Sequence, residues 1–164
     1  MNEQINLPVR KLSRDVIKVW LISESIENGI GFIMLGILLY LDYLFSWKEW
    51  IGWILLGITV LGVGGSLWSF IRPFILYKNW RYDVDEEFLQ FKSGVVKQVY
   101  QLVPMTKIQS VAMEQGPILR KYGLYSVSVE TMGSSHAIPG LPEEVAIELR
   151  NQIAHYARLK EVEE

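Results

Sequence analysis

The sequence predicts a two-helix transmembrane hairpin followed by a mostly-β domain that ends in an α-helix. Two long apolar runs fill the first half of the chain, and short alternating strands separated by turn residues fill the second. Half of the 164 residues are hydrophobic, more than is usual for a soluble domain of this size. We expect four segments: a cytoplasmic N-terminal segment (1–20), the hairpin (21–72), a cytoplasmic β domain (78–160) and an acidic tail (161–164).

The first apolar run extends over about residues 22–45. Its length is close to the roughly 20 residues that a helix needs to cross the hydrocarbon core. Glu24 and Glu27 lie on one helix face near the end of this run, where carboxylates can reach the headgroups. We interpret both as interfacial, with a polar contact to a partner helix as the alternative. No alanine precedes Ala112, which argues against a cleaved signal peptide.

The second apolar run, about residues 51–71, has no charged residue and is the stronger membrane-spanning candidate. Small residues in this run recur at a spacing of four, which lets another helix approach closely in a bilayer. The candidate helix-packing residues are Gly57, Gly62, Ser66, Gly65 and Ser69. We expect their neighbour to be the first helix of the same chain, with a second protein as the alternative.

Aromatic and basic residues predict the boundaries and the orientation of the hairpin. All six tryptophans lie between positions 20 and 80, and most are near a predicted helix end, as in the aromatic belts of membrane proteins. Basic residues flank the hairpin on both outer sides (Arg10, Lys11, Arg14, Lys18, Arg72, Lys78 and Arg81), whereas the connecting loop has Lys48 alone. The positive-inside rule therefore predicts a multi-pass cell-membrane protein with both termini in the cytoplasm.

The second half of the chain alternates β-rich segments with turns. Pro73 is expected to end or bend the second membrane helix, and strand-like sequence begins near residue 79. A turn at Ser93-Gly94 leads into the run VVKQVYQLV, and alternation is clearest in YSVSVET, residues 125–131. We expect six or seven antiparallel strands, including a short one at residues 136–138 that Pro139-Gly140 ends.

The last predicted element is an amphipathic helix. Pro142 suits its first position, and Glu143 and Glu144 suit the positive end of the helix dipole. An apolar stripe follows at helical spacing: Val145, Ala146, Leu149, Ile153, Tyr156 and Ala157. Such a helix can cap a bent antiparallel sheet or partly open barrel of about seven strands.

Several segments, in this order, resemble the bacterial pleckstrin-homology (PH) domain family, long catalogued as a domain of unknown function. The segments are SGVVKQVYQLVPMTKIQSV, PILRKYGL, SVSVET and IPGLPEEVAIELRNQI; KIQSV and the P-x-L-R-x-x-G bend from Pro117 to Gly123 are the most specific. Two transmembrane helices before one such domain look like the YdbS-type membrane proteins of Gram-positive bacteria. This resemblance covers nearly the whole chain and implies a PH-like fold more strongly than any activity.

The same resemblance implies a partner and a setting. Members of the family often occur beside a larger relative that has several such domains, so a protein of that kind is the expected partner. Envelope stress, or defence against membrane-active agents, is the physiological setting that the resemblance implies.

The sequence offers little support for catalysis, metal binding or nucleic-acid binding. There is no cysteine, no phosphate loop and no dinucleotide motif, and His136 and His155 are not in a metal-binding pattern. Ser134 and Ser135 stand beside His136, but neighbours in one turn rarely reach nucleophile–base geometry. A deep polar pocket that joined His136 to an acid would instead favour a membrane hydrolase. The net charge of −2 lacks the basic excess of a nucleic-acid binder. We therefore expect a non-enzymatic protein without cofactor or metal.

One cationic pair remains, Arg120 and Lys121 in the bend between two strands, with Lys107 as a candidate neighbour. The first hairpin of the domain carries Asp83, Asp85, Glu86 and Glu87, unlike the basic hairpins that hold phosphoinositides in eukaryotic PH domains. We favour a solvated turn in which residues 117–119 pack inward. The sequence thus predicts a scaffold that assembles with a related membrane protein or with itself. The alternative is an anionic-lipid-sensing module that uses Arg120 and Lys121.

Overall fold

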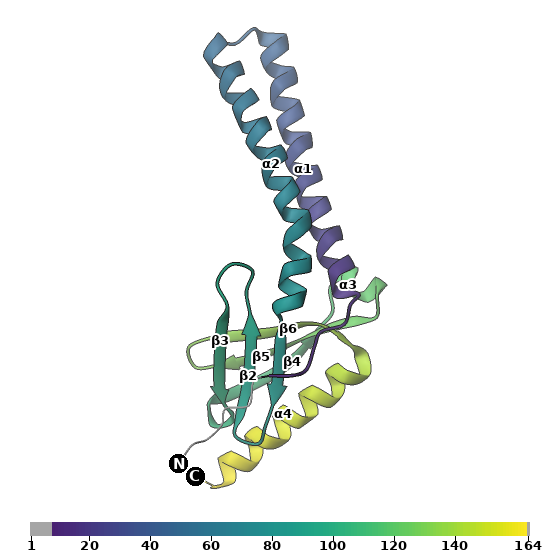
Figure 1. Ribbon diagram of the computed structural model, residues 1–164, viewed down its shortest axis with the longest axis vertical. Helices are drawn as coiled ribbons and strands as arrows, with labels where there is room; N and C mark the ends of the chain where they lie inside the picture. The colour runs from purple at the N-terminus through teal and green to yellow at the C-terminus, as the bar shows by residue number, and fades with distance from the viewer. Residues whose placement is uncertain (1–7, 164) are drawn as a thin grey trace. The chain divides into compact units, whose positions relative to one another are not determined.

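The computed structural model describes residues 8–163, and the side chains of residues 8–159. The chain divides into two compact units: a helical hairpin, residues 20–74, and a β domain that combines residues 75–163 with residues 8–19. The predicted fold class is confirmed, because two long apolar helices precede two three-stranded antiparallel sheets and a C-terminal helix, consistent with a PH-like fold (Figure 1). Residues 1–7 of the predicted N-terminal segment, and residue 164 of the predicted tail, lie outside the described residues.

The hairpin consists of α1 (Val16–Phe45) and α2 (Glu49–Asn79). Both helices are long and apolar enough to cross a membrane, and both extend beyond the predicted apolar runs. The expectation that α2 could end at Pro73 was wrong, because the helix continues for six more residues. Pro73 deprives the Ser69 carbonyl of its usual N–H donor, and a long helix tolerates the loss of that single hydrogen bond.

The β domain has six strands within the described residues, in agreement with the predicted number. One sheet has the order β1–β2–β3, with β1 (Arg81–Val84), β2 (Phe88–Ser93) and β3 (Val99–Pro104). The other has the order β4–β5–β6, with β4 (Ile108–Glu114), β5 (Leu124–Thr131) and β6 (Ser135–Pro142). A 3-10 turn, η1 (Met105–Lys107), leads from the first sheet into the second, and a short helix, α3 (Pro117–Lys121), joins β4 to β5.

Two strand boundaries differ from the prediction. Residues 95–98 form the turn between β2 and β3, so β3 begins at Val99 and not directly after Gly94. β6 does not end at Pro139-Gly140 but continues to Pro142, with a register shift opposite Tyr125 and Val127. β6 is an edge strand, where the missing N–H of a proline costs no hydrogen bond if it faces away from the sheet.

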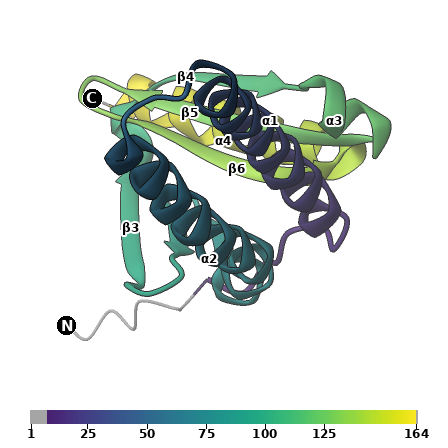
Figure 2. The same cartoon turned by 90° about the horizontal axis from the view of Figure 1, so that it is seen from above.

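The final helix, α4 (Glu143–Glu163), packs along the second sheet and on η1 (Figure 2). It begins one residue after Pro142 and extends into the stretch predicted as an acidic tail. The predicted stripe faces the core, since Ala146, Leu149 and Ile153 are fully buried. The other fully buried apolar side chains of the core come from both sheets and from η1: Tyr82, Leu89, Met105, Val127, Val129, Ile138 and Leu141.

Residues 8–19 belong to the β domain, although the sequence suggested a separate N-terminal segment. Arg10 and Tyr82 exchange backbone hydrogen bonds of 3.0 and 3.1 Å at the free edge of β1. Three residues later, the Ser13 N–H donates to the Gly140 carbonyl of β6 at 3.1 Å. Leu12, Val16 and Val19 are buried. This segment thus links the free edges of the two sheets and adds three side chains to the core.

Candidate functional site

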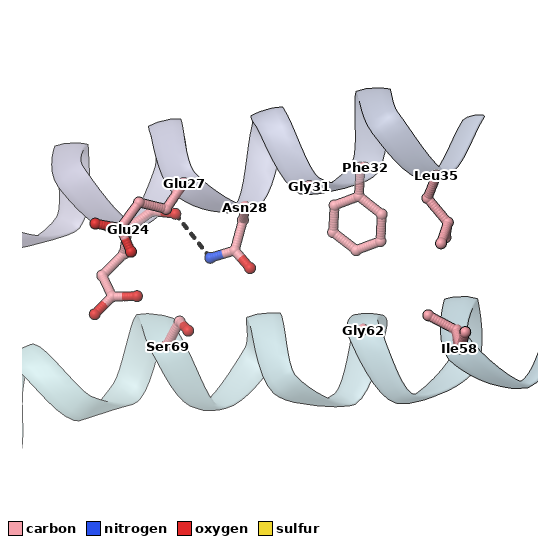
Figure 3. A pocket seen from close by; sticks show the side chains of 9 residues that line it. All are labelled: Glu24, Glu27, Asn28, Gly31, Phe32, Leu35, Ile58, Gly62 and Ser69. Atoms are coloured by element: carbon pink, nitrogen blue, oxygen red, sulfur yellow. Dashed lines mark hydrogen bonds between the residues drawn. The ribbon is translucent and has the colours of Figure 1, made fainter. Parts of the chain in front are cut away.

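The most developed site of the hairpin is a cavity of about 350 Å³ between α1 and α2. Its polar end is formed by side chains of both helices, with Glu24, Glu27 and Asn28 on α1 and Ser69 on α2 (Figure 3). The Asn28 side-chain amide donates to the Glu24 carbonyl at 2.7 Å, a bond within one helix turn. Glu24 is largely covered and forms an ion pair with Arg72 of α2, with 3.4 Å between Oε1 and Nη1.

The ion pair distinguishes between the two interpretations of the glutamates. Glu24 contacts the neighbouring helix of its own chain, which agrees with the alternative of a polar interhelical contact. Glu27 lines the cavity from an exposed position, as an interfacial carboxylate can. Arg72 and Asn28 were not recognised as site residues from the sequence. Asn28 could have been found, because it follows Glu24 by four residues and so shares its helix face.

The other end of the cavity is apolar, and a glycine of α2 faces an aromatic ring of α1 there. Phe32, Leu35 and Ile58 line it together with Gly31 and Gly62 (Figure 3). A Cβ atom at Gly62 would lie 3.7 Å from the ring of Phe32, so this glycine accommodates the aromatic side chain of α1. The cavity therefore joins a carboxylate and amide end to a hydrocarbon end, an arrangement that suits an amphipathic group.

The five candidate helix-packing residues do not share one face of α2. Gly62 and Ser69 line the cavity beside α1. Ser66 donates its hydroxyl to the Val63 carbonyl of its own helix at 2.8 Å. No atom of the described chain would lie within 4 Å of a Cβ atom at Gly57 or Gly65. The contact between α1 and α2 thus accounts for part of the predicted set and leaves Gly57 and Gly65 uncovered.

In the β domain, Arg120 and Lys121 occupy the last turn of α3, and both are exposed. Pro117 is also exposed, and Ile118 and Leu119 are half-buried, so no residue of α3 is fully buried. Tyr122 follows directly, and the Lys18 ammonium lies 5.9 Å from the centre of its ring. The same ammonium forms an ion pair with Asp15 at 2.7 Å, so Lys18 brings a balanced pair of charges to Tyr122 and no net positive charge.

Lys107 does not join this group. It belongs to η1, directly before β4, whereas α3 follows the other end of that strand. The seven residues of β4 separate them by about 20 Å at the usual rise of a strand. Among the described residues, neither Lys107 nor Arg120 nor Lys121 forms an ion pair. The structure thus separates Lys107 from the cationic pair.

The serine–histidine turn borders a second hollow, of about 430 Å³, on the β domain. The Ser134 hydroxyl lies 2.9 Å from Nε2 of His136, and the His136 ring lies beside that of Phe91 with centroids 5.6 Å apart. The hollow is lined by aromatic, hydroxyl and amide side chains, and no described carboxylate lines it. This geometry gives the pair no acid to orient the imidazole, so nothing in it favours a hydrolase.

Comparison with known proteins agrees with this architecture. The family described as Bacterial PH domain matches residues 16–157, a range that includes both long helices and all six strands. The chain belongs to the bacterial PH domain family. It is also 35% identical over 159 residues to the UPF0699 transmembrane protein YdbS of Bacillus subtilis (strain 168), with 97% of each chain covered. No solved structure matches the chain significantly.

Membership of the bacterial PH domain family has two direct consequences. This chain is a transmembrane protein with two candidate spans, α1 and α2, as its full-length relative is described. The family is uncharacterised and carries no enzymatic description, which fits a protein that is not an enzyme. The interhelical cavity and the cationic turn of α3 are features of this chain's own geometry.

Proposed function

We propose that this bacterial PH domain protein is a non-enzymatic, multi-pass membrane scaffold that assembles with a second membrane protein through the uncovered glycine face of α2. Gly57 and Gly64 lie seven residues apart and share a helix face, with Gly65 at its border. None of the three would bring a Cβ atom within 4 Å of another part of the described chain. Leu61, between the first two, is 77% exposed.

The argument rests on the contrast between two faces of one helix. Gly62, on the inner face, lies against Phe32 of α1, whereas the outer face has equally small residues and no described side chain packs on them. Small residues in a membrane helix allow the backbone of another helix to approach closely. Contact with lipid tails does not require small residues. A second transmembrane helix is therefore the neighbour that this outer face suits best.

The partner that we propose is a larger related membrane protein with several PH-like domains, or a second copy of this chain. This follows from the family resemblance, as does a role in envelope stress or in defence against membrane-active agents. We place the protein in the cell membrane with both termini in the cytoplasm, because basic residues flank both outer ends of the hairpin.

The test is to purify the chain from its own cells in a mild detergent and to identify the membrane proteins that accompany it. We expect a partner, or a homo-oligomer, that is lost in Gly57→Ile because the new side chain blocks helix approach. Val63→Phe adds bulk to another exposed side of α2 and should keep the assembly. A wild-type chain that is recovered as a monomer, without any membrane protein, would refute the proposal.

A second candidate function is anionic-lipid sensing by Arg120 and Lys121. The observation in its favour is that Arg120 and Lys121 are both exposed and that neither forms an ion pair with another described residue. In this case the full chain in vesicles should bind fluorescent anionic lipid, and the binding should fall with salt and with Arg120→Ala/Lys121→Ala. Lys107→Ala is the control, because Lys107 lies at the other end of β4. Equal lipid binding by all of these chains would exclude the cationic pair.

A further inference from the structure

The turn between β2 and β3 exposes apolar side chains at the tip of a hairpin. Val96 is 88% exposed, and Val99, Tyr100 and Leu102 of β3 are 40, 55 and 47% exposed. Gly94 starts this turn with a φ of +132°, a backbone conformation that favours glycine. The apolar tip is thus part of an ordered turn with a defined geometry, and no described residue covers it.

The charges of this hairpin are all of one sign. Residues 88–103 contain Lys92 and Lys97 and no acidic residue. The ammonium of Lys92 lies 5.0 Å from the centre of the Tyr100 ring, so a lysine and a tyrosine are adjacent on the hairpin. The turn at the opposite end of β2 is Asp85-Glu86-Glu87. One end of the β2 strand is therefore apolar and basic, and the other end is acidic.

A hydrogen bond fixes the basic end of β2 beside the end of α2. The Asn79 side-chain amide donates to the Gly94 carbonyl at 3.0 Å, and Asn79 is the last residue of α2. The register of the sheet agrees, since Arg81 at the start of β1 pairs with Lys92 near the end of β2. Asn79 follows the uncharged run of α2 by eight residues, or about 12 Å of helix. The two residues from Gly94 to Val96 can span about 6 Å from this hydrogen bond.

We infer that the β2–β3 turn, with Val96 at its tip, inserts into the headgroup region of the bilayer that α2 crosses. Val96 would reach the boundary with the acyl chains, while Lys92, Lys97 and Tyr100 would lie at the level of the phosphates, where such side chains are enriched. The acidic turn at the far end of β2 would then face the water. This contact is independent of the proposed helix assembly and involves neither Arg120 nor Lys121.

Fluorescence quenching in vesicles tests this inference directly. The chain has no cysteine, so Val96→Cys provides a single site for an environment-sensitive dye such as NBD. Glu86→Cys, in the turn at the other end of β2, is the matched control with the same dye. Both full-length chains are reconstituted into vesicles of phosphatidylcholine and phosphatidylglycerol that contain lipids with a nitroxide at a shallow acyl position.

We expect the dye at position 96 to be quenched several-fold more strongly by the nitroxide lipid than the dye at position 86, and to emit at shorter wavelength. Equal quenching at both positions, or quenching at position 96 by aqueous iodide alone, would overturn the inference.

Photocrosslinking of lipid to the unlabelled wild-type chain is a second test, and it needs no variant. A photoactivatable phospholipid should crosslink to peptides that contain residues 94–98 more often than to those that contain residues 85–87, and the reverse preference would also overturn it.

Discussion

Gly140 has no side chain because Val16 occupies the space that a Cβ atom would need. An added Cβ would collide with the isopropyl group of Val16, which is fully buried, and Gly140 also has a φ of +67°. This close contact between Val16 and Gly140 joins the N-terminal segment to β6. The sequence marks Gly140 as a turn residue but does not indicate that a residue more than a hundred positions away closes over it.

Gly140→Ala should therefore destabilise the β domain by about 1–3 kcal/mol, from overpacking and backbone strain. The free energy of unfolding of the full chain in detergent is the measurement. Gly133→Ala is the control, since a Cβ atom there meets nothing within 4 Å, and it should have little effect. Adding Val16→Ala to Gly140→Ala should cost less than the sum of the two single changes. Equal stability of the Gly140 and Gly133 variants would contradict this contact.

Tyr82 makes the stability of the domain depend on pH in the alkaline range. Its side chain is 2% exposed, and burial raises its pKa above the ordinary value of 10, with Asp83 and Glu148 acting in the same direction and Arg10 against it. The folded state therefore keeps the proton more tightly than the unfolded state. The stabilisation is present below pH 10 and is lost as the pH rises through the folded pKa.

We expect the unfolding free energy to fall above pH 10 by up to about 1.4 kcal/mol for each pH unit from this group. Tyr82→Phe removes the titrating hydroxyl and should flatten that part of the profile relative to wild type. Denaturant titrations of both chains between neutral and alkaline pH supply the measurement. Parallel profiles for the two chains would show that Tyr82 does not titrate differently on folding.

The elements were predictable where one local pattern determines them. The apolar runs predicted α1 and α2 because a spanning helix needs only length and low charge, and strict alternation predicted β5. Boundaries at proline were less predictable. Pro73 lies within a helix because the long helix can spare one hydrogen bond, and Pro139 lies within a strand because it falls at a register shift of an edge strand.

Packing within the hairpin was harder to predict than the helices themselves. Spacing identifies the small residues of α2 but not the side of the helix that α1 covers, which depends on bulky partners such as Phe32 and on the pairing of Arg72 with Glu24. The sequence therefore grouped Gly57 and Gly65 with Gly62. Likewise, the sequence did not show that Lys107 lies apart from Arg120 and Lys121, because this depends on β4 running between η1 and α3.

Gly62→Leu should loosen the hairpin by about 1–3 kcal/mol, because the larger side chain would press on Phe32. Gly64→Leu is the matched control on the uncovered face and should leave the isolated hairpin about as stable as wild type. Helix unfolding in mixed detergent–SDS micelles, followed by circular dichroism, compares the two. A similar loss in both variants would mean that α1 does not pack on Gly62.

The molecule as a whole is a continuous chain in which the β domain includes residues on both sides of the hairpin. Residues 8–19 precede α1 and residues 75–163 follow it, yet they form one compact unit. The association of these two segments depends on tertiary contacts. The Arg10–Tyr82 and Ser13–Gly140 backbone hydrogen bonds join parts of the chain whose sequences give no indication that they pair. This is why the fold class was predictable and the extent of the domain was not.

Leu12→Ala should destabilise the β domain as a core substitution does, by about 2–5 kcal/mol, although Leu12 precedes the hairpin. Val9→Ala is its control, because Val9 is 73% exposed three residues earlier, and it should change the unfolding free energy by less than about 0.5 kcal/mol. Hydrogen exchange of the strands in detergent shows where protection is lost. If the strands kept the same protection in Leu12→Ala, residues 8–19 would not be part of the β domain's core, and this account would be contradicted.

The central claim, that the hairpin presents a face of α2 to another membrane protein, is tested most directly by photocrosslinking in living cells. A photoreactive amino acid at Leu61, on the uncovered glycine face, is compared with one at Leu55, which is 7% exposed. We predict a discrete protein adduct from position 61, a related membrane protein or a second copy of the chain, and none from position 55. Lipid adducts alone from position 61 would contradict the claim.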